Sequence, residues 1–338
     1  MKLLEHVALA PRTTLGLGGP ARFYVKAADD AALIEALEWA RSESVEARVL
    51  GGGSNLVVAD AGFDGLVIEM AQRGLQIDGG HLTAAAGEDW DELVARCVAE
   101  DLAGVECLSG IPGRVGATPI QNVGAYGQEV SQTIERVRVL DRESLEQRTL
   151  SPDECEFGYR DSMFKRTPGR YVVLEVTFAL TPGGAPLLAY AELQRALDGD
   201  AAPALAKVRE TVIALRRRKS MVLDPADPNG RSAGSFFTNP IVAPAVADRL
   251  VEASDEPVPR WPTDDGRVKL AAGWLIERAG MTKGARRGAV GISTAHALAL
   301  VHHGGGTTAE LLALADEVRD AVEARFGVRL VREPTLWS

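Results

Sequence analysis

Cysteine is scarce in this chain, which has three cysteines among 338 residues. Cys97, Cys107 and Cys155 form no C-x-x-C pair, and their number is odd. A disulfide framework or a zinc site is therefore not expected. The pattern predicts buried free thiols in a protein from a reducing compartment.

Long apolar runs and an excess of positive charge are missing as well. No segment approaches the ~20 apolar residues that span a bilayer. The short apolar stretch at the N-terminus contains Glu5 and His6, which a signal peptide would not. The net charge of −10 disfavours a general binder of nucleic acid or of membrane surfaces, since those partners are polyanionic. We expect a cytoplasmic monomer that binds neither nucleic acid nor membranes.

What is present is an ordinary globular composition, 46% hydrophobic and 25% charged, in a chain long enough for two or three domains. Apolar patterning predicts strands at 22–27, 47–50, 56–59, 66–70, 81–86, 134–141, 171–180, 297–302 and 328–332. It predicts helices at 29–41, 90–100, 190–197, 203–219, 243–253, 269–279 and 308–326. Without strict alternation of strand and helix, this order indicates an α+β fold and not a Rossmann fold.

The segment 109–127 is the most informative part of the chain. It holds five glycines and two prolines in nineteen positions, and Arg114 is its only charged residue. Neither a helix nor a central strand tolerates that density of glycine and proline, so a long structured loop is expected. Such a loop is suited to close backbone approach to an anion such as a diphosphate. The alternative is an ordinary surface crossover.

A second glycine loop, Gly51-Gly52-Gly53, lies between two apolar strands. It is not a P-loop, because no Gly-Lys-Ser/Thr follows, nor a dinucleotide fingerprint, because a strand follows where that motif needs a helix. Alone it could be a hairpin turn. Together the two loops predict a nucleotide cofactor held by backbone amides.

Six motifs then appear in order: Gly51–Asn55, the 109–127 loop, Gly158-Tyr-Arg-Asp-Ser162, Ala233-Gly-Ser-Phe-Phe-Thr-Asn-Pro240, Lys269–Ile276 and Glu333-Pro334. The glycine loops alone would indicate only the wider vanillyl-alcohol-oxidase type of flavin-binding superfamily. The whole set, from about residue 10 to the C-terminus, resembles the long-loop subclass of the UDP-N-acetylenolpyruvoylglucosamine reductase (UDP-N-acetylmuramate dehydrogenase) family. These are flavoenzymes of bacterial peptidoglycan precursor synthesis.

The resemblance implies a two-part FAD-binding module of the vanillyl-alcohol-oxidase/PCMH type at 1–70 and 71–220. A C-terminal α/β substrate domain at 221–330 would follow, with a tail at 331–338 returning to the active site. It implies non-covalent FAD, NADPH as reductant, and the enolpyruvyl ether of UDP-N-acetylglucosamine as substrate. The expected cofactor-binding residues are Gly51, Gly52, Gly53, Ser54, Asn55, Gly113, Gly116, Ala117, Thr118 and Asn122.

Three residues match the family's catalytic positions. Arg160 would lie against the substrate carboxylate, Ser235 would donate a proton to carbon, and Glu333 would complete the site. Taken from the residues alone, each has an ordinary alternative. Arg160 could form a surface ion pair with Asp161 or Glu156, Ser235 could end a strand, and Glu333 could be a solvated carboxylate near a frayed terminus.

The resemblance also implies a substrate-binding set, made of Tyr190, Arg216, Lys219, Asn239, Lys269 and Lys283. The basic run 216–219 ends a predicted helix, where cations also favour the helix dipole. At most two of its side chains can face one ligand, and Arg216 and Lys219, three apart, are the expected pair. Lys269 and Lys283 could be surface lysines, and Tyr190 could be a core residue.

No functional role is predicted for the histidines His296, His302 and His303. Many relatives carry glutamine where this chain has His296, which puts one uracil or ribose contact in doubt. His302 and His303 are adjacent on a predicted strand and point to opposite faces, so they cannot share a metal ion.

Two other functions fit parts of the sequence. One is a small-alcohol oxidase of the same superfamily, although neither glycine loop has the histidine or cysteine that often attaches flavin covalently. The other is a nucleotide-binding module without turnover, which the presence of arginine, serine and glutamate at the three catalytic positions disfavours.

Overall fold

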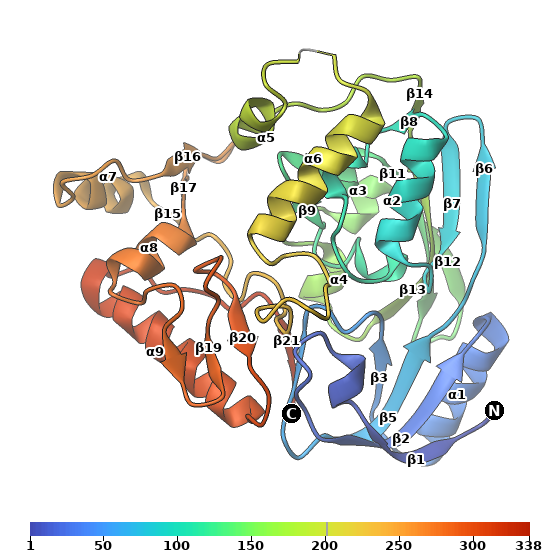
Figure 1. Cartoon of the computed structure of the whole chain (residues 1–338). Helices are drawn as coiled ribbons and strands as arrows, with labels where there is room; N and C mark the ends of the chain where they lie inside the picture. The colour runs from blue at the N-terminus through green and yellow to red at the C-terminus, as the bar shows by residue number, and fades with distance from the viewer. Residues whose placement is uncertain (201) are drawn as a thin grey trace. The chain divides into compact units, whose positions relative to one another are not determined.

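The computed structural model describes residues 1–338 except Ala201, and it divides into two compact units (Figure 1). The first unit consists of Met1–Val7, Ala21–Gly53 and Phe63–Leu223. The second unit consists of Ala8–Pro20, Ser54–Gly62 and Asp224–Ser338. The division falls inside the triple-glycine loop, between Gly53 and Ser54.

The first unit begins with a four-stranded sheet in the order β1-β2-β5-β3. Its strands are β1 (Leu4–Ala8), β2 (Pro20–Ala27), β5 (Phe63–Met70) and β3 (Ala47–Leu50), and β2, β5 and β3 are parallel. Helix α1 (Asp30–Ser42) connects β2 to β3. Its N-cap is Asp29, whose side chain accepts a hydrogen bond from the Ala32 amide, and the helix buries Leu33 and Ala36.

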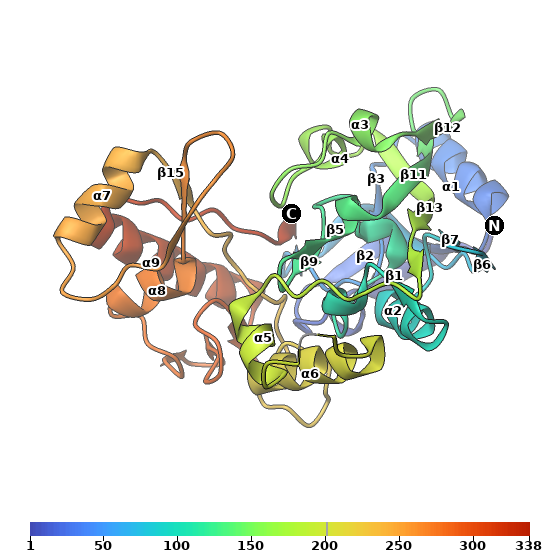
Figure 2. The same cartoon turned by 90° about the horizontal axis from the view of Figure 1, so that it is seen from above.

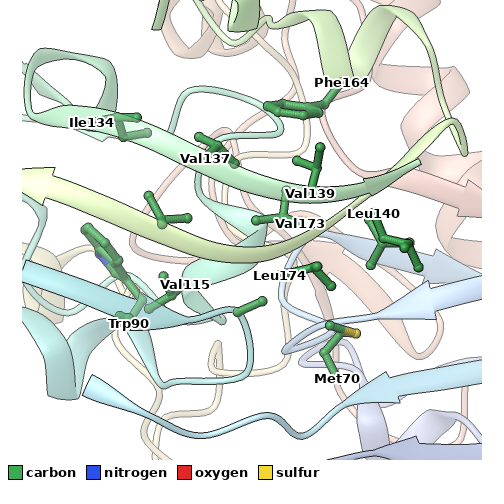
Figure 3. Packing of buried hydrophobic residues seen from close by; sticks show 14 of the residues in the cluster. Met70, Trp90, Val115, Ile134, Val137, Val139, Leu140, Phe164, Val173 and Leu174 are labelled. Atoms are coloured by element: carbon green, nitrogen blue, oxygen red, sulfur yellow. The ribbon is translucent and has the colours of Figure 1, made fainter. Parts of the chain in front are cut away.

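A five-stranded antiparallel sheet follows, in the order β12-β11-β13-β7-β6. Its strands are β12 (Gln147–Leu150), β11 (Ile134–Asp141), β13 (Tyr171–Ala179), β7 (His81–Ala85) and β6 (Leu75–Asp78). Apolar side chains of β11 and β13 pack with Trp90, the first residue of α2 (Trp90–Ala99), in the large core of this unit (Figure 3). Burial on both faces explains why β13 is almost continuously apolar.

Helices α5 (Ala191–Ala196) and α6 (Leu205–Arg218) lie beside each other and form a smaller core (Figure 2). Leu193 and Leu197 are buried there with Val208, Val212 and Leu215. Short elements complete the unit: β8 (Leu102–Ala103), β9 (Gly124–Ala125), β10 (Gln128–Glu129), β14 (Thr181–Pro182), α3 (Pro152–Cys155) and α4 (Met163–Arg166), with 3-10 turns at Glu106–Leu108, Val115–Ala117 and Val130–Gln132.

The second unit has a core of its own, built around α9 (Thr308–Phe326) and α8 (Ala272–Arg278). Three small sheets surround it. They are β15 (Ile241–Val242), β17 (Val268–Leu270) and β16 (Arg260–Pro262); β18 (Arg286–Arg287), β19 (Val290–Ile292) and β20 (Leu300–His302); and β21 (Thr335–Trp337) with β4 (Leu56–Val58). Helix α7 (Pro244–Glu252) and a 3-10 turn at Ala10–Arg12 complete this unit.

The α+β class is confirmed, and most expected elements end within about three residues of their predicted bounds. One helix boundary differs, and one expected strand does not form. The helix expected from 269 begins at Ala272, because Val268–Leu270 pairs as β17 with two short strands. Residues 328–332 form no regular strand: Arg332 makes one isolated antiparallel bridge with Phe237, and the regular strand of the tail begins at Thr335. No helix among the described residues is long and apolar enough to cross a membrane.

Candidate active site

The two glycine loops of the first unit touch each other. A Cβ on Gly52 would lie 2.7 Å from Gly113 Cα, closer than real Cβ contacts come. At Gly51 the nearest atoms to such a Cβ are 3.8 Å away, an ordinary contact. Only a glycine therefore lets the 51–53 turn approach the 109–127 loop at residue 52.

Backbone donors at this junction are available to a ligand. Among the described residues, the amides of Gly51, Gly52 and Gly53 donate no hydrogen bond, and the same holds for Gly113 and Arg114. The amides of residues 115–118 are used internally, by acceptors that include Ala86 and Glu88. The junction thus fits the diphosphate of a dinucleotide cofactor such as FAD, with its donors concentrated at 51–53 and 113–114.

Three expected cofactor residues have structural tasks of their own in this loop. A Cβ on Gly116 would lie 2.5 Å from Ala86 Cβ, so glycine is required there for packing. The Thr118 hydroxyl donates to the Val115 carbonyl. Asn122 is buried and donates from Nδ2 to Glu129 (2.8 Å) and to the Gly158 carbonyl (3.0 Å). Ala117 lies in the same 3-10 turn.

Arg160 lies in the first unit with its backbone in the left-handed region, at φ 52°. Its guanidinium donates to the Gly124 carbonyl and lies 5.5 Å from the Tyr159 ring. The acidic neighbours Asp161 and Glu156 pair with Arg166. The Arg160 guanidinium is therefore oriented by the end of the 109–127 loop.

Ser235 and Glu333 both lie in the second unit, and the backbone brings their segments together. The Glu333 amide donates to the Phe236 carbonyl (2.9 Å). The Ser235 hydroxyl bonds to no described residue, while the two phenylalanines after it are 1% exposed. The tail is docked: Thr335 donates to the Asn55 carbonyl (3.0 Å), next to Ser54. Arg160 belongs to the other unit.

At the end of α6, Lys219 contacts two residues of the first unit, Glu192 and Tyr126. Its Nζ lies 2.6 Å from Glu192 of α5 and 5.7 Å from the centroid of the Tyr126 ring. Tyr126 in turn packs edge-on against Tyr190, with ring centroids 5.5 Å apart. Burial raises the pKa of Tyr126 to about 12, so this phenol stays protonated.

Arg216 turns toward the start of the 109–127 loop. Its Nη2 donates to the Met221 carbonyl (2.6 Å), its Nε is buried without a partner, and burial lowers its pKa. Arg216 Nε lies 3.4 Å from where a Cβ on Gly110 would stand. The Gly110 amide donates to Asp91 (2.6 Å). Asp91 also accepts a hydrogen bond from each terminal guanidinium nitrogen of Arg209.

The remaining expected substrate residues lie in the second unit. Asn239 accepts a hydrogen bond from the Ala272 amide (2.9 Å) and so helps to start α8. Lys269 Nζ stands 6.0 Å from the centroid of the exposed Trp261 ring. Lys283 pairs with Glu277 at 3.3 Å, the ordinary surface arrangement.

Two histidines and all three cysteines have defined surroundings in the structure. His296 lies in a turn held by the buried Ser293, whose hydroxyl accepts from the His296 amide. His302 is buried between the Leu15 carbonyl and the Gly306 amide. Across the described chain, no three His, Cys, Asp or Glu side chains gather as a metal site. All three cysteines are buried free thiols, and burial raises the pKa of each to about 12.

Comparisons with known proteins give two family matches in this chain. Residues 21–149 match the FAD binding domain family, and residues 224–337 match the C-terminal domain of UDP-N-acetylenolpyruvoylglucosamine reductase. A protein of that name from Thermobifida fusca (strain YX) is 52% identical, covering 98% of this chain and 97% of its own. One from Streptomyces coelicolor (strain ATCC BAA-471 / A3(2) / M145) is also 52% identical, covering 98% and 89%.

The chain belongs to the UDP-N-acetylenolpyruvoylglucosamine reductase family. The solved UDP-N-acetylenolpyruvylglucosamine reductase from Thermus caldophilus agrees, with a TM-score of 0.71, 26% identity and complete coverage of both chains. The protein is an FAD-dependent oxidoreductase. Its glycine junction lies in the unit that contains most of the FAD-binding match.

Sequence reasoning missed three residues of the first unit: Asp91, Tyr126 and Glu192. Asp91 holds the start of the glycine-rich loop, and the other two contact Lys219. Glu192 had a local signal, because it follows Tyr190 in the first turn of a predicted helix. Asp91 had none, because its partners Gly110 and Arg209 are distant in sequence.

Proposed function

We propose that this reductase converts the enolpyruvyl ether of UDP-N-acetylglucosamine into UDP-N-acetylmuramate, with NADPH as reductant, in peptidoglycan precursor synthesis. The observation that carries the proposal is 52% identity to named reductases along almost the whole chain. We also propose that it acts as a cytoplasmic monomer of the long-loop subclass and thereby serves cell-wall growth and division.

Bound FAD would supply the hydride that adds to the terminal vinyl carbon, after NADPH has reduced it. In this proposal the protein handles charge and protons. Negative charge develops on the adjoining carbon and its carboxylate, and the permanently charged fork of Arg160 is suited to stabilise it. Charge stabilisation of this preorganised kind lowers a barrier by about 3–4 kcal/mol per donor.

Ser235 is assigned the proton that the second carbon receives. Its hydroxyl bonds to no described residue and stands next to buried phenylalanines, which would keep water away from a proton in transit. Glu333 is assigned a supporting part in the same charge stabilisation, for which it must be protonated or share a proton. Lys219, Arg216 and Tyr190 are assigned to the substrate's diphosphate, and Asn239 to its sugar; Lys269 and Lys283 are weaker members of the set.

The test is NADPH consumption by the purified yellow protein, followed at 340 nm with and without the enolpyruvyl sugar nucleotide. We expect oxidation of one NADPH for each substrate molecule, with little oxidation in its absence. Sustained flavin reoxidation by oxygen would instead favour an oxidase of the same superfamily. No substrate-dependent NADPH oxidation in protein that retains FAD would favour a module without turnover.

A further inference from the structure

Lys219, which the proposed function assigns to the substrate's diphosphate, is paired with a carboxylate of its own unit. Its Nζ lies 2.6 Å from Glu192 Oε2. The two side chains are 33% and 32% exposed, so the pair is open to solvent and can be reached by a ligand. A phosphate that binds Lys219 must therefore compete with Glu192.

Glu192 is presented from a helix that is held in place. Its neighbour Leu193 is 0% exposed in the small core that α5 shares with α6. The chain before α5 is held as well, because the buried carboxylate of Glu106 accepts the Leu187 amide (2.9 Å) and the Gly104 amide (2.7 Å). The Glu192 side chain can therefore move away from Lys219 by rotation about its own bonds, while α5 stays packed.

The position of Lys219 makes this competition matter. Lys219 caps the C-terminus of α6, where the helix dipole is negative and disfavours an anion. A diphosphate there depends on side-chain cations. Arg216, the other cation assigned to the diphosphate, already donates from Nη2 to the Met221 carbonyl, which leaves less of its guanidinium for a ligand. The ion pair between Glu192 and Lys219 therefore lowers the affinity for the diphosphate.

We propose that Glu192 is an affinity-setting residue: its carboxylate holds Lys219 in the free enzyme and is displaced when the diphosphate of the sugar nucleotide binds. This inference rests on the proposed function. A competing role and a positioning role for Glu192 predict opposite changes in the affinity for the diphosphate. If Glu192 competes, neutralising it tightens diphosphate binding; if it only orients Lys219, neutralising it weakens binding.

The experiment compares wild-type holoenzyme with Glu192→Gln, Lys219→Ala and a matched control, Glu210→Gln. Glu210 is an exposed glutamate of α6 whose lysine partner Lys207 is 3.7 Å away, so it tests the loss of one negative charge alone. UDP binding is measured by calorimetry, and KM for the enolpyruvyl sugar nucleotide by NADPH oxidation. Calorimetry needs no turnover, so a missing wild-type reaction would refute the proposed function separately.

We expect Glu192→Gln to lower both the Kd for UDP and the KM by about two- to fivefold, as suits a partly exposed ion pair. Lys219→Ala should raise both by about tenfold or more, since it removes a charge-assisted contact. Glu210→Gln should change neither appreciably. Weaker UDP binding by Glu192→Gln, a change no larger than that of Glu210→Gln, or unaltered UDP binding by Lys219→Ala would each overturn the inference.

Discussion

At the scale of the residue, Ser235 has the most specific chemical assignment. Its hydroxyl bonds to no described residue, so removing it should disturb little of the fold. Ser235→Ala should bind FAD and accept electrons from NADPH at near wild-type rates, because neither step needs its proton. Reoxidation of the reduced flavin by the enolpyruvyl substrate should slow by about 10²–10⁴-fold, the range for lost general acid catalysis. Anaerobic stopped-flow absorbance measures the two half-reactions separately.

Ser235→Cys is the matched control, since a thiol of similar size is a stronger acid and should restore part of the second rate. Equal slowing of both half-reactions in the alanine variant would make Ser235 a structural or cofactor-positioning residue.

Gly51 and Gly52 are adjacent, yet they should respond differently to alanine. A methyl group on Gly52 would lie 2.7 Å from Gly113 backbone, whereas one on Gly51 would meet only ordinary contacts near 3.8 Å. Gly52→Ala should therefore push the two glycine loops apart, lower the free energy of unfolding of the apoprotein by about 1–3 kcal/mol and weaken retention of FAD. Gly51→Ala should leave apoprotein stability unchanged. Urea unfolding measures the stability of the apoprotein, and the flavin absorbance of purified protein measures retained FAD. Equal stabilities of the two apoprotein variants would contradict the steric argument.

At the scale of the element, Asp91 joins α2 to α6 and to the glycine-rich loop. Burial by itself would raise the pKa of Asp91, but hydrogen bonds from Arg209 and the Gly110 amide outweigh it and hold the pKa below the ordinary value of an aspartate. A lowered carboxylate pKa contributes stability that is present above pH ~4 and is lost as pH falls through the folded-state value.

Asp91→Asn should therefore destabilise the protein at pH 7, by about 1–2 kcal/mol for this partly exposed pair, and loosen the start of the loop. The variant should also retain FAD less well. Urea midpoints between pH 3 and 7 provide the check: the difference from wild type should shrink toward acid pH. A difference independent of pH would mean that the charge on Asp91 is not what stabilises the junction.

The elements that sequence predicts well are those whose signal is local. Helix α9 shows a capping box at Thr307 and Glu310 and a left-handed glycine at Gly327, and both its ends were predicted correctly. The segment 328–332, Val-Arg-Leu-Val-Arg, looked like a strand, but strand pairing requires a partner along its length, and this segment has one isolated bridge, between Arg332 and Phe237. The partner of the tail, β4, lies nearly 280 residues earlier and pairs only with Thr335–Trp337.

The same limit applies to the site. Glycine loops are recognisable from composition, so the FAD-binding region 21–149, which contains both loops, could be anticipated from the sequence. The amides that remain free could not be predicted, because that depends on internal acceptors such as Ala86 and Glu88. Pairings such as Glu192 with Lys219 depend on how two helices pack.

At the scale of the whole molecule, the second unit is not one continuous piece of chain. It includes Ala8–Pro20 and Ser54–Gly62 as well as Asp224–Ser338. Leu15, Leu17 and Val57 belong to its core and are at most 4% exposed. Asp60 accepts hydrogen bonds from the first two amides of α9, at 2.7 and 2.9 Å, and so caps the N-terminus of that helix.

The fragment 224–338, although it begins where the C-terminal family match begins, should therefore not fold stably by itself. It would lose three buried aliphatic side chains, worth about 1.5–3 kcal/mol each, against a typical net stability of about 5–15 kcal/mol. It would also leave β21 without its partner strand. Circular dichroism should show no cooperative thermal transition for this fragment. A single chain that joins 8–20 and 54–62 to 224–338 through flexible linkers should regain one, because every segment of the unit is then present. A cooperative transition in the bare fragment would show that the two N-terminal segments are dispensable to this core.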